Sequence, residues 1–165
     1  MPSFHDTTTS AAPPEDVWKL LYDPSRFPDW WAGIGTVEVN GSREYTMYPE
    51  GYPDFPMAQL LDTQRDQHRV TVSCLVSDLR FEWRLEPAGD GTLITVNVEI
   101  PDTEAHRLET QRQTITTSMQ RLARLAAGST DAAARVVKTG DIWDSLWNTM
   151  PCCWFPSADR SGGTT

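Results

Sequence analysis

The segment Ala12–Trp31 reads APPEDVWKLLYDPSRFPDWW, and its residue order indicates two short helices joined at Asp23. Proline suits the first turn of a helix, where its missing N–H leaves no hydrogen bond unmade, so Pro14 and Pro24 fit the two helix starts. Asp23 is a favourable N-cap residue for the second helix. Because a helix this short is unstable by itself, its aromatic side chains must pack on a larger body.

Seven stretches around this segment carry the period-two alternation, or the threonine-rich composition, of β-strands. They span residues 4–10, 34–39, 43–48, 57–63, 70–76, 80–86 and 94–100. Asn40-Gly41 is well suited to a two-residue type I′ turn between the second and third strands. From the third strand onward the connections are also short, apart from the proline-rich loop 49–56. Short turns between alternating runs are typical of an antiparallel meander.

A long helix is predicted over residues 103–127, which contain no proline or glycine. Its apolar stripe is formed by Leu108, Ile115, Met119, Leu122 and Ala126, and Gln111 and Arg112 interrupt it. If Arg112 points inward, it needs a partner such as Asp6 or an anionic group of a ligand, because an unpaired buried charge is costly. A small rotation of the helix would instead let Arg112 reach solvent from the stripe edge.

The helix pair, with Asp23–Trp30 matching a "DPxxxPxW" pattern, resembles the START-like helix-grip (SRPBCC) superfamily. This superfamily contains pollen-allergen-like proteins and the polyketide cyclase/dehydrase group. The resemblance implies an α+β helix-grip fold: a seven-stranded antiparallel curved sheet wrapped on a long C-terminal helix, with two short helices after the first strand. Residues 3–127 follow that order, so we expect a ligand-binding domain over residues 1–127.

Residues 128–165 exceed what this fold needs and are predicted to form a tryptophan-rich tail. Residues 131–138 fit a short helix, and residues 141–150 carry one apolar face. A helix this short needs a partner surface. We expect the helix over residues 141–150 to dock over or beside the pocket between the sheet and the long helix. Two alternatives stay open: it covers the outer face of the sheet, or it binds another subunit. The end of the tail is expected to be disordered.

Composition excludes several classes of partner. The net charge of −9 disfavours phosphate contacts with nucleic acid, and no apolar run is long enough to span a membrane. The three histidines are scattered without metal-ligand spacing, so no metal or other cofactor is expected. The odd cysteine count, with Cys152 and Cys153 adjacent, gives no disulfide framework and favours a reducing cytoplasm. A monomer or a homodimer is expected.

The resemblance implies a cavity between sheet and helix that binds hydrophobic molecules such as lipids, sterols or polyketides. Strand alternation and helix periodicity predict its lining as Trp31, Tyr45, Met47, Phe81, Trp83, Val96, Arg112, Ile115 and Met119. Aromatic and sulfur-containing walls suit a planar or flexible apolar ligand, although the same residues would also make an ordinary core. Trp31 is predicted at the cavity mouth with Tyr52 and Phe55 of the proline-rich loop, and this loop would act as a lid.

Three functions therefore stay open, and no catalytic residue is assigned. The first is a carrier of a small hydrophobic molecule. The second is a polyketide cyclase or aromatase, in which a polar cavity group stabilises an enolate. The resemblance implies a cavity arginine for that enzyme, but the fourth strand, Met57-Ala58-Gln59-Leu60-Leu61, has none. The third is an interaction module that uses the tail.

Overall fold

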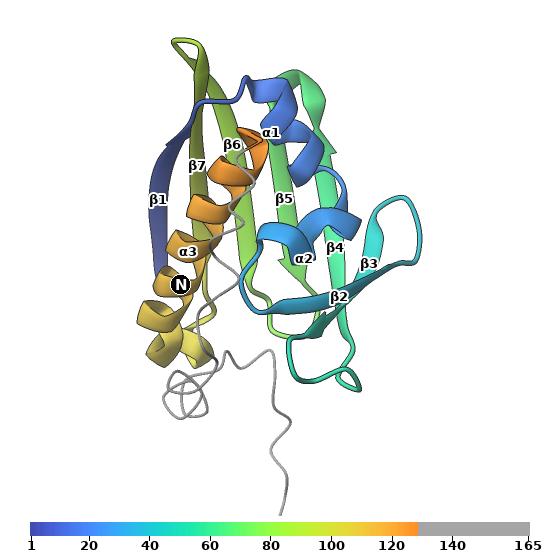
Figure 1. Ribbon diagram of the computed structural model, residues 1–165. Helices are drawn as coiled ribbons and strands as arrows, with labels where there is room; N and C mark the ends of the chain where they lie inside the picture. The colour runs from blue at the N-terminus through green and yellow to red at the C-terminus, as the bar shows by residue number, and fades with distance from the viewer. Residues whose placement is uncertain (129–165) are drawn as a thin grey trace, which may run out of the picture.

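The computed structural model describes residues 1–128, where seven antiparallel strands form one sheet in the order β1-β7-β6-β5-β4-β3-β2 (Figure 1). The strands are β1 (Ser3–Ser10), β2 (Ile34–Val39), β3 (Glu44–Pro49), β4 (Met57–Gln64), β5 (Arg69–Cys74), β6 (Arg80–Ala88) and β7 (Gly91–Glu99). Strands β2 to β7 form the predicted meander. The last strand, β7, lies beside the first, and β1 pairs with it along its whole length. The helix-grip prediction is confirmed.

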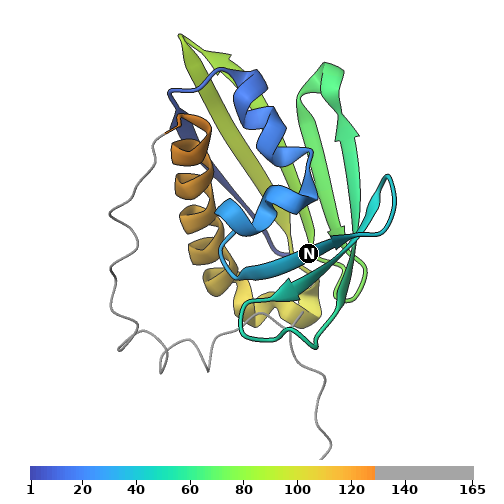
Figure 2. The same cartoon turned by 45° about the vertical axis from the view of Figure 1, so that its right-hand side comes forward.

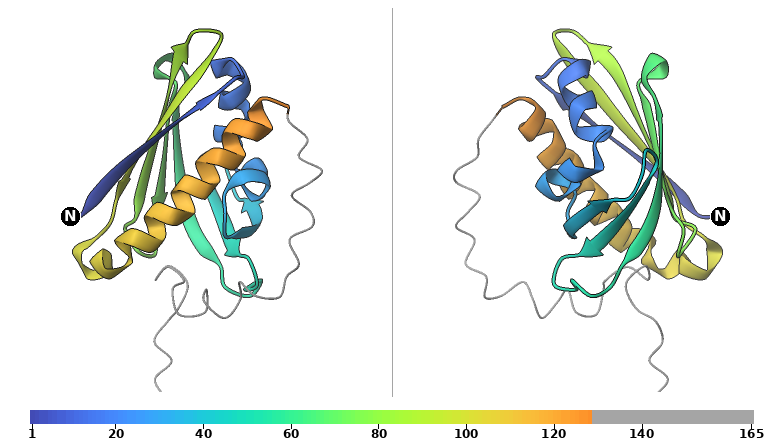
Figure 3. Two further views of the ribbon diagram at one scale, coloured as in Figure 1. Left: turned by 60° about the vertical axis from the view of Figure 1, so that its left-hand side comes forward. Right: turned by 90° about the vertical axis from the view of Figure 1, so that its right-hand side faces the viewer.

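Helices cover one face of this sheet. The short helices α1 (Pro14–Leu21), η1 (Pro24–Arg26) and α2 (Phe27–Trp30) follow β1; η2 (Arg65–Gln67) connects β4 to β5; and η3 (Asp102–Arg107) leads into α3 (Leu108–Ala126). Figures 2 and 3 show α3 running across the concave face, with α1 and α2 on the same side. Within residues 1–128, no helix is long and apolar enough to cross a membrane.

The helix pair forms for the reasons that the sequence indicates. Asp23 caps η1 by accepting a hydrogen bond from the Ser25 backbone N–H at 3.0 Å, and Pro24 occupies the first position. Pro14 opens α1, whose apolar face is fully covered. The Trp30 indole N–H donates to the Leu20 carbonyl at 3.2 Å, which ties α2 to α1. This hydrogen bond therefore holds the two short helices against each other.

Side-chain hydrogen bonds fix α3 against the sheet and the helix pair. The Ser10 hydroxyl at the end of β1 donates to the Ala123 carbonyl at 2.8 Å, and Thr116 donates to the Asp6 carboxylate at 2.6 Å. From the other side, the Ala32 N–H donates to the Ser118 hydroxyl at 2.9 Å. These contacts set the position of α3 along its axis and decide which of its residues face inward.

Two local predictions differ from the structure. Asn40-Gly41 does not form a type I′ turn, because neither residue has the positive φ that this turn requires. Four residues connect β2 to β3, and the N–H groups of Asn40 and Gly41 both donate to the Glu44 carbonyl. Strand β5 also stops at Cys74 instead of continuing to residue 76. Its carbonyl accepts from the N–H of Asp78, whose φ of 56° turns the chain into β6.

The long helix begins later than predicted. Residues 102–107 form the 3-10 helix η3, and α3 proper begins at Leu108. The absence of proline and glycine, on which the prediction depended, does not distinguish the two kinds of helix. The predicted tail helices and their docking surface fall in residues 129–165, outside the described part of the chain.

Candidate ligand-binding interior

A layer of aromatic rings lines the interior between the sheet and the helices. The Trp31 ring, directly after α2, lies edge-on to Phe81 and Trp83 of β6, with centroid separations of 5.1 and 5.5 Å. Phe27 continues the layer, 5.4 Å from Trp31 and 5.6 Å from Tyr45 on β3. Aromatic pairs prefer such edge-to-face contacts. The layer therefore joins α2, β3 and β6 into one rigid apolar wall.

Most residues predicted to line a cavity lie in this interior. Val96 sits beside Trp83 in the sheet register and is fully buried, as are Ile115 and Met119 on α3. Met47 is half-buried beside Met57 of β4. Burial agrees with the predicted facing of these side chains, and their contact with a ligand stays a prediction.

Arg112 is the exception. Its side chain is 45% exposed, with the Nε atom 3.8 Å from a Glu109 carboxylate oxygen and the guanidinium carbon 4.9 Å from the centre of the Phe4 ring. The residue that interrupts the apolar stripe on its inner side is Gln111, which is buried. One residue along a helix changes direction by about 100°. The inward assignment of Arg112 is therefore wrong, and its alternative at the stripe edge describes the structure.

We expect Arg112→Ala to lower the free energy of unfolding by less than about 1 kcal/mol, because an exposed ion pair and an exposed cation–π contact each contribute little. Ligand uptake should not change. Denaturant titration beside native mass spectrometry checks both. A loss of several kcal/mol, or of a bound ligand, would restore an interior role for this side chain.

Buried polar groups divide into two kinds. Ser10, Thr92 and Ser118 are satisfied by backbone partners; for example, the Thr92 hydroxyl donates to the Ala12 carbonyl at 2.7 Å. The Nε2 amide of Gln59 and the indole N–H of Trp83 have no hydrogen-bond partner among the described residues. Gln59 is 2% exposed and Trp83 is fully buried. The interior therefore holds two donors that residues 1–128 leave unpaired.

Gln59 lies within a short polar row on the inner face of the sheet. Its register neighbours are Tyr45 on β3 and Cys74 on β5, both almost completely buried. Burial, and secondarily Cys74, raises the pKa of the Tyr45 phenol far above its usual value. Tyr45 therefore stays protonated. Residues 1–128 contain no group of three or more His, Cys, Asp or Glu side chains suited to hold a metal ion.

The sequence contains a signal for Gln59 that the cavity prediction left out. Gln59 alternates with Met57 and Leu61, which are both buried, so its side chain belongs to the inner face of β4. An amide at such a position would ordinarily be paired. Only the fold shows which donors are unpaired.

The proline-rich loop, residues 49–56, packs against the interior through two aromatic side chains. Tyr52 and Phe55 are half-buried and pack against the apolar core. The loop turns at Gly51, whose φ is 84°. Trp31 remains 7% exposed. A lid role for this loop stays a prediction.

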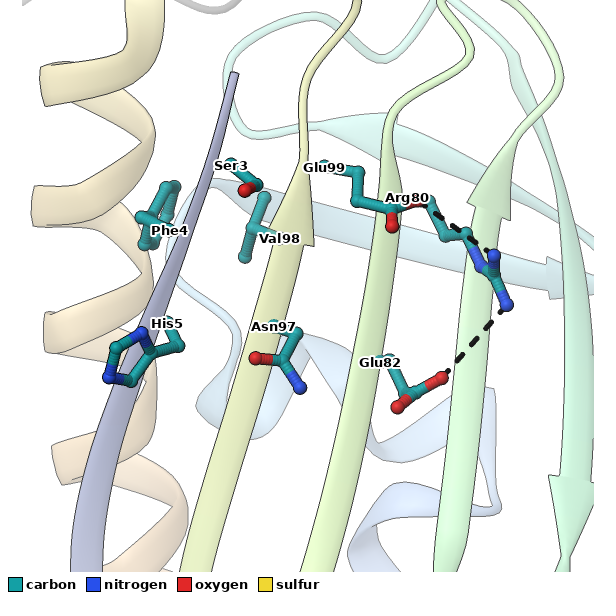
Figure 4. A pocket seen from close by; sticks show the side chains of 8 residues that line it. All are labelled: Ser3, Phe4, His5, Arg80, Glu82, Asn97, Val98 and Glu99. Carbon is teal, nitrogen blue, oxygen red and sulfur yellow. Dashed lines mark ion pairs between the residues drawn. The ribbon is translucent and has the colours of Figure 1, made fainter. Parts of the chain in front are cut away.

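A separate surface pocket of about 300 Å³ lies on the opposite face of the sheet (Figure 4). It is lined by Ser3, Phe4, His5, Arg80, Glu82, Asn97, Val98 and Glu99. The Arg80 guanidinium lies 4.0 Å from Glu82 and 3.8 Å from Glu99, as the dashed lines show. These charges pair with one another on a solvated strand face. The pocket lacks the apolar wall that a hydrophobic ligand needs.

Comparison with protein families gives a match over residues 1–127 to the model described as "Polyketide cyclase / dehydrase and lipid transport". Comparison with curated proteins gives no significant match.

Solved structures share the fold at low sequence identity. The di-domain ARO/CYC BexL from the BE-7585A biosynthetic pathway superposes with a TM-score of 0.65 at 12% identity, over 75% of this chain and 46% of BexL. A START superfamily protein from Mycobacterium smegmatis gives a TM-score of 0.59 at 13% identity, over 74% of this chain and 98% of its own. Ara h 8.0201 gives a TM-score of 0.54 at 16% identity, over 77% of this chain and 98% of its own. At these identities the likeness shows the fold alone.

Proposed function

We propose that this chain, which belongs to the polyketide cyclase/dehydrase and lipid transport family, binds a small hydrophobic molecule between its sheet and α3. The observation that supports this most directly is the buried aromatic wall of Trp31, Phe81 and Trp83. Rigid aromatic walls bury a large apolar area of a ligand without losing much side-chain entropy. The proline-rich loop, with Tyr52 and Phe55 half-buried against the core, would act as its lid.

The second candidate is a cyclase or aromatase. The polar row of Tyr45, Gln59 and Cys74 supports it, because neutral donors in a dry site can stabilise a developing oxyanion. Against it, Arg112 is exposed and no buried residue within 1–128 carries a formal charge. We therefore place binding first and turnover second. The tail as an interaction module stays a third hypothesis.

Native mass spectrometry of gently purified protein tests the binding proposal. We expect a discrete added mass that is lost on denaturation and whose identification gives the ligand class. If the protein carries no added mass and takes up no member of a panel of fatty esters, sterols and aromatic polyketides, the binding proposal is wrong. Incubation of the identified ligand with the protein, followed by product analysis, then separates a carrier from a cyclase.

Trp31→Ala should reduce ligand uptake by about tenfold or more, because it opens the aromatic wall where Phe27, Phe81 and Trp83 meet. The matched control is Tyr22→Ala, since Tyr22 is an aromatic residue that is 48% exposed beside α1. Titration with the ligand found by mass spectrometry measures both variants. Equal uptake by the two would show that the wall is only a structural core.

A further inference from the structure

We infer that the row of Tyr45, Gln59 and Cys74 is a hydrogen-bonding subsite for a neutral carbonyl group on an otherwise apolar ligand. The inference rests on the proposed function above, since it assumes that the interior takes up a ligand. It adds which end of that ligand is recognised, by which atom, and in which charge state.

The geometry of the row comes from the sheet register. Tyr45 of β3 lies opposite Gln59 of β4, which lies opposite Cys74 of β5. Side chains at directly opposed positions stand about 4.5–5.5 Å apart at Cβ on one face of a sheet. The three residues are 1%, 2% and 3% exposed, so they form one continuous polar strip in a water-poor interior.

The unpaired atom defines what the strip recognises. The Gln59 Nε2 amide is a donor without any partner in the described chain. A buried donor left unpaired is destabilising, and native structures hold few of them. The group that satisfies it must be an acceptor, and a ligand carbonyl oxygen has the required lone pairs. The oxygen of the same amide can accept a hydrogen bond from a neighbouring hydroxyl or thiol, and no member of the row then changes its charge.

The surrounding groups favour a neutral acceptor over a carboxylate. Within residues 1–128, the buried polar side chains are Ser10, Gln59, Thr71, Thr92, Gln111 and Ser118, and none is charged. An ionised carboxylate brought into such an interior would lack the paired cation that it needs. The Tyr45 phenol also remains protonated, since burial raises its pKa. A ketone, an ester or an aldehyde therefore fits better than a fatty acid.

The test uses the full chain and three probes with the same chain length: 2-undecanone, undecane and undecanoate at neutral pH. Binding is followed by tryptophan fluorescence and by native mass spectrometry. We expect the ketone to bind about tenfold more tightly than the alkane, a difference of one hydrogen bond to an otherwise unpaired donor. Undecanoate should bind more weakly than the ketone.

Gln59→Met removes the amide and keeps the length of the side chain. We expect the preference for ketone over alkane to fall to about twofold or less, with alkane affinity unchanged. The matched control is Gln113→Met, the same substitution on the exposed side of α3, which should keep the preference. Far-UV circular dichroism and the melting temperature verify that both variants fold.

The remaining outcomes show whether the subsite or the proposed function is wrong. If wild-type protein binds ketone and alkane equally, the subsite is wrong and hydrophobic binding stands. If no probe binds and the native protein carries no ligand, the proposed function itself is wrong. A preference that survives Gln59→Met but disappears in Trp83→Phe would assign recognition to the Trp83 indole and overturn the role of Gln59. Tighter binding of undecanoate than of the ketone would overturn the selection for a neutral group.

Discussion

Gly91→Ala is expected to lower the melting temperature by more than about 10 °C, because an alanine methyl group has no room at this position. A Cβ atom built on Gly91 would lie 2.1 Å from the Ser10 carbonyl oxygen and 3.3 Å from the Ala11 Cα. Both obstacles are backbone atoms, so no side-chain rotation relieves the overlap. The end of β1 would have to separate from the start of β7, at the point where the chain leaves the sheet for α1.

The loss of stability in Gly91→Ala also includes the hydrogen bonds formed near the end of β1. The Ser10 hydroxyl donates to the Ala123 carbonyl of α3, and the adjacent Thr92 hydroxyl donates to the Ala12 carbonyl. Losing two buried hydrogen bonds, with the strain of moving the backbone, amounts to about 3–4 kcal/mol. Domains of this kind have total stabilities of about 5–15 kcal/mol.

Gly41→Ala is the matched control for this prediction. Nothing lies within 4 Å of a Cβ built on Gly41, and its φ is outside the left-handed region. We expect its stability to change by less than about 1 kcal/mol, with a gain possible because alanine restricts the unfolded chain. Thermal unfolding of both variants beside wild type makes the comparison. Similar melting temperatures for Gly91→Ala and wild type would mean that the β1–β7 contact relaxes easily.

The fold was predictable because its signals are local. Proline and aspartate mark the starts of the helix pair, and period-two alternation marks β6, where Phe81 and Trp83 face inward between charged neighbours. Predictions failed where two structures share one local signal. Asn40-Gly41 suits a type I′ turn, yet the pairing of β2 with β3 leaves four residues to connect them.

The candidate site was less predictable because it depends on helix rotation and on distant partners. Gln111 and Arg112 are adjacent polar residues in one stripe, and the apolar pattern tolerates either of them on the inner side. Contacts far away in sequence decide between them: Ser10 with Ala123, Asp6 with Thr116, and Ser118 with Ala32. Whether the Gln59 amide is paired is likewise a property of three neighbouring strands and not of β4 alone.

Trp30→Ala should lower the free energy of unfolding by about 3–5 kcal/mol, the usual loss for truncating a large buried aromatic side chain. Trp30 is fully buried, and its ring centroid lies 5.4 Å from Phe27, 5.2 Å from Trp31 and 5.3 Å from Trp83. Removing it would leave a cavity where α2 meets β6. Urea titration followed by circular dichroism measures the loss, and a change below about 1 kcal/mol would contradict this packing.

A pair of milder substitutions separates the ring from its hydrogen bond. Trp30→Phe keeps an aromatic ring but removes the N–H that bonds the Leu20 carbonyl, so a buried acceptor loses its partner. Trp83→Phe removes a similar ring edge, but its N–H has no partner in the described chain, so no bond is broken. We therefore expect Trp30→Phe to cost about 1–2 kcal/mol more than Trp83→Phe. Equal losses of unfolding free energy in the two variants would mean that the Trp83 indole is paired in solution, by water or by a bound molecule. If the loss in Trp83→Phe depends on added ligand, the bound molecule is that partner.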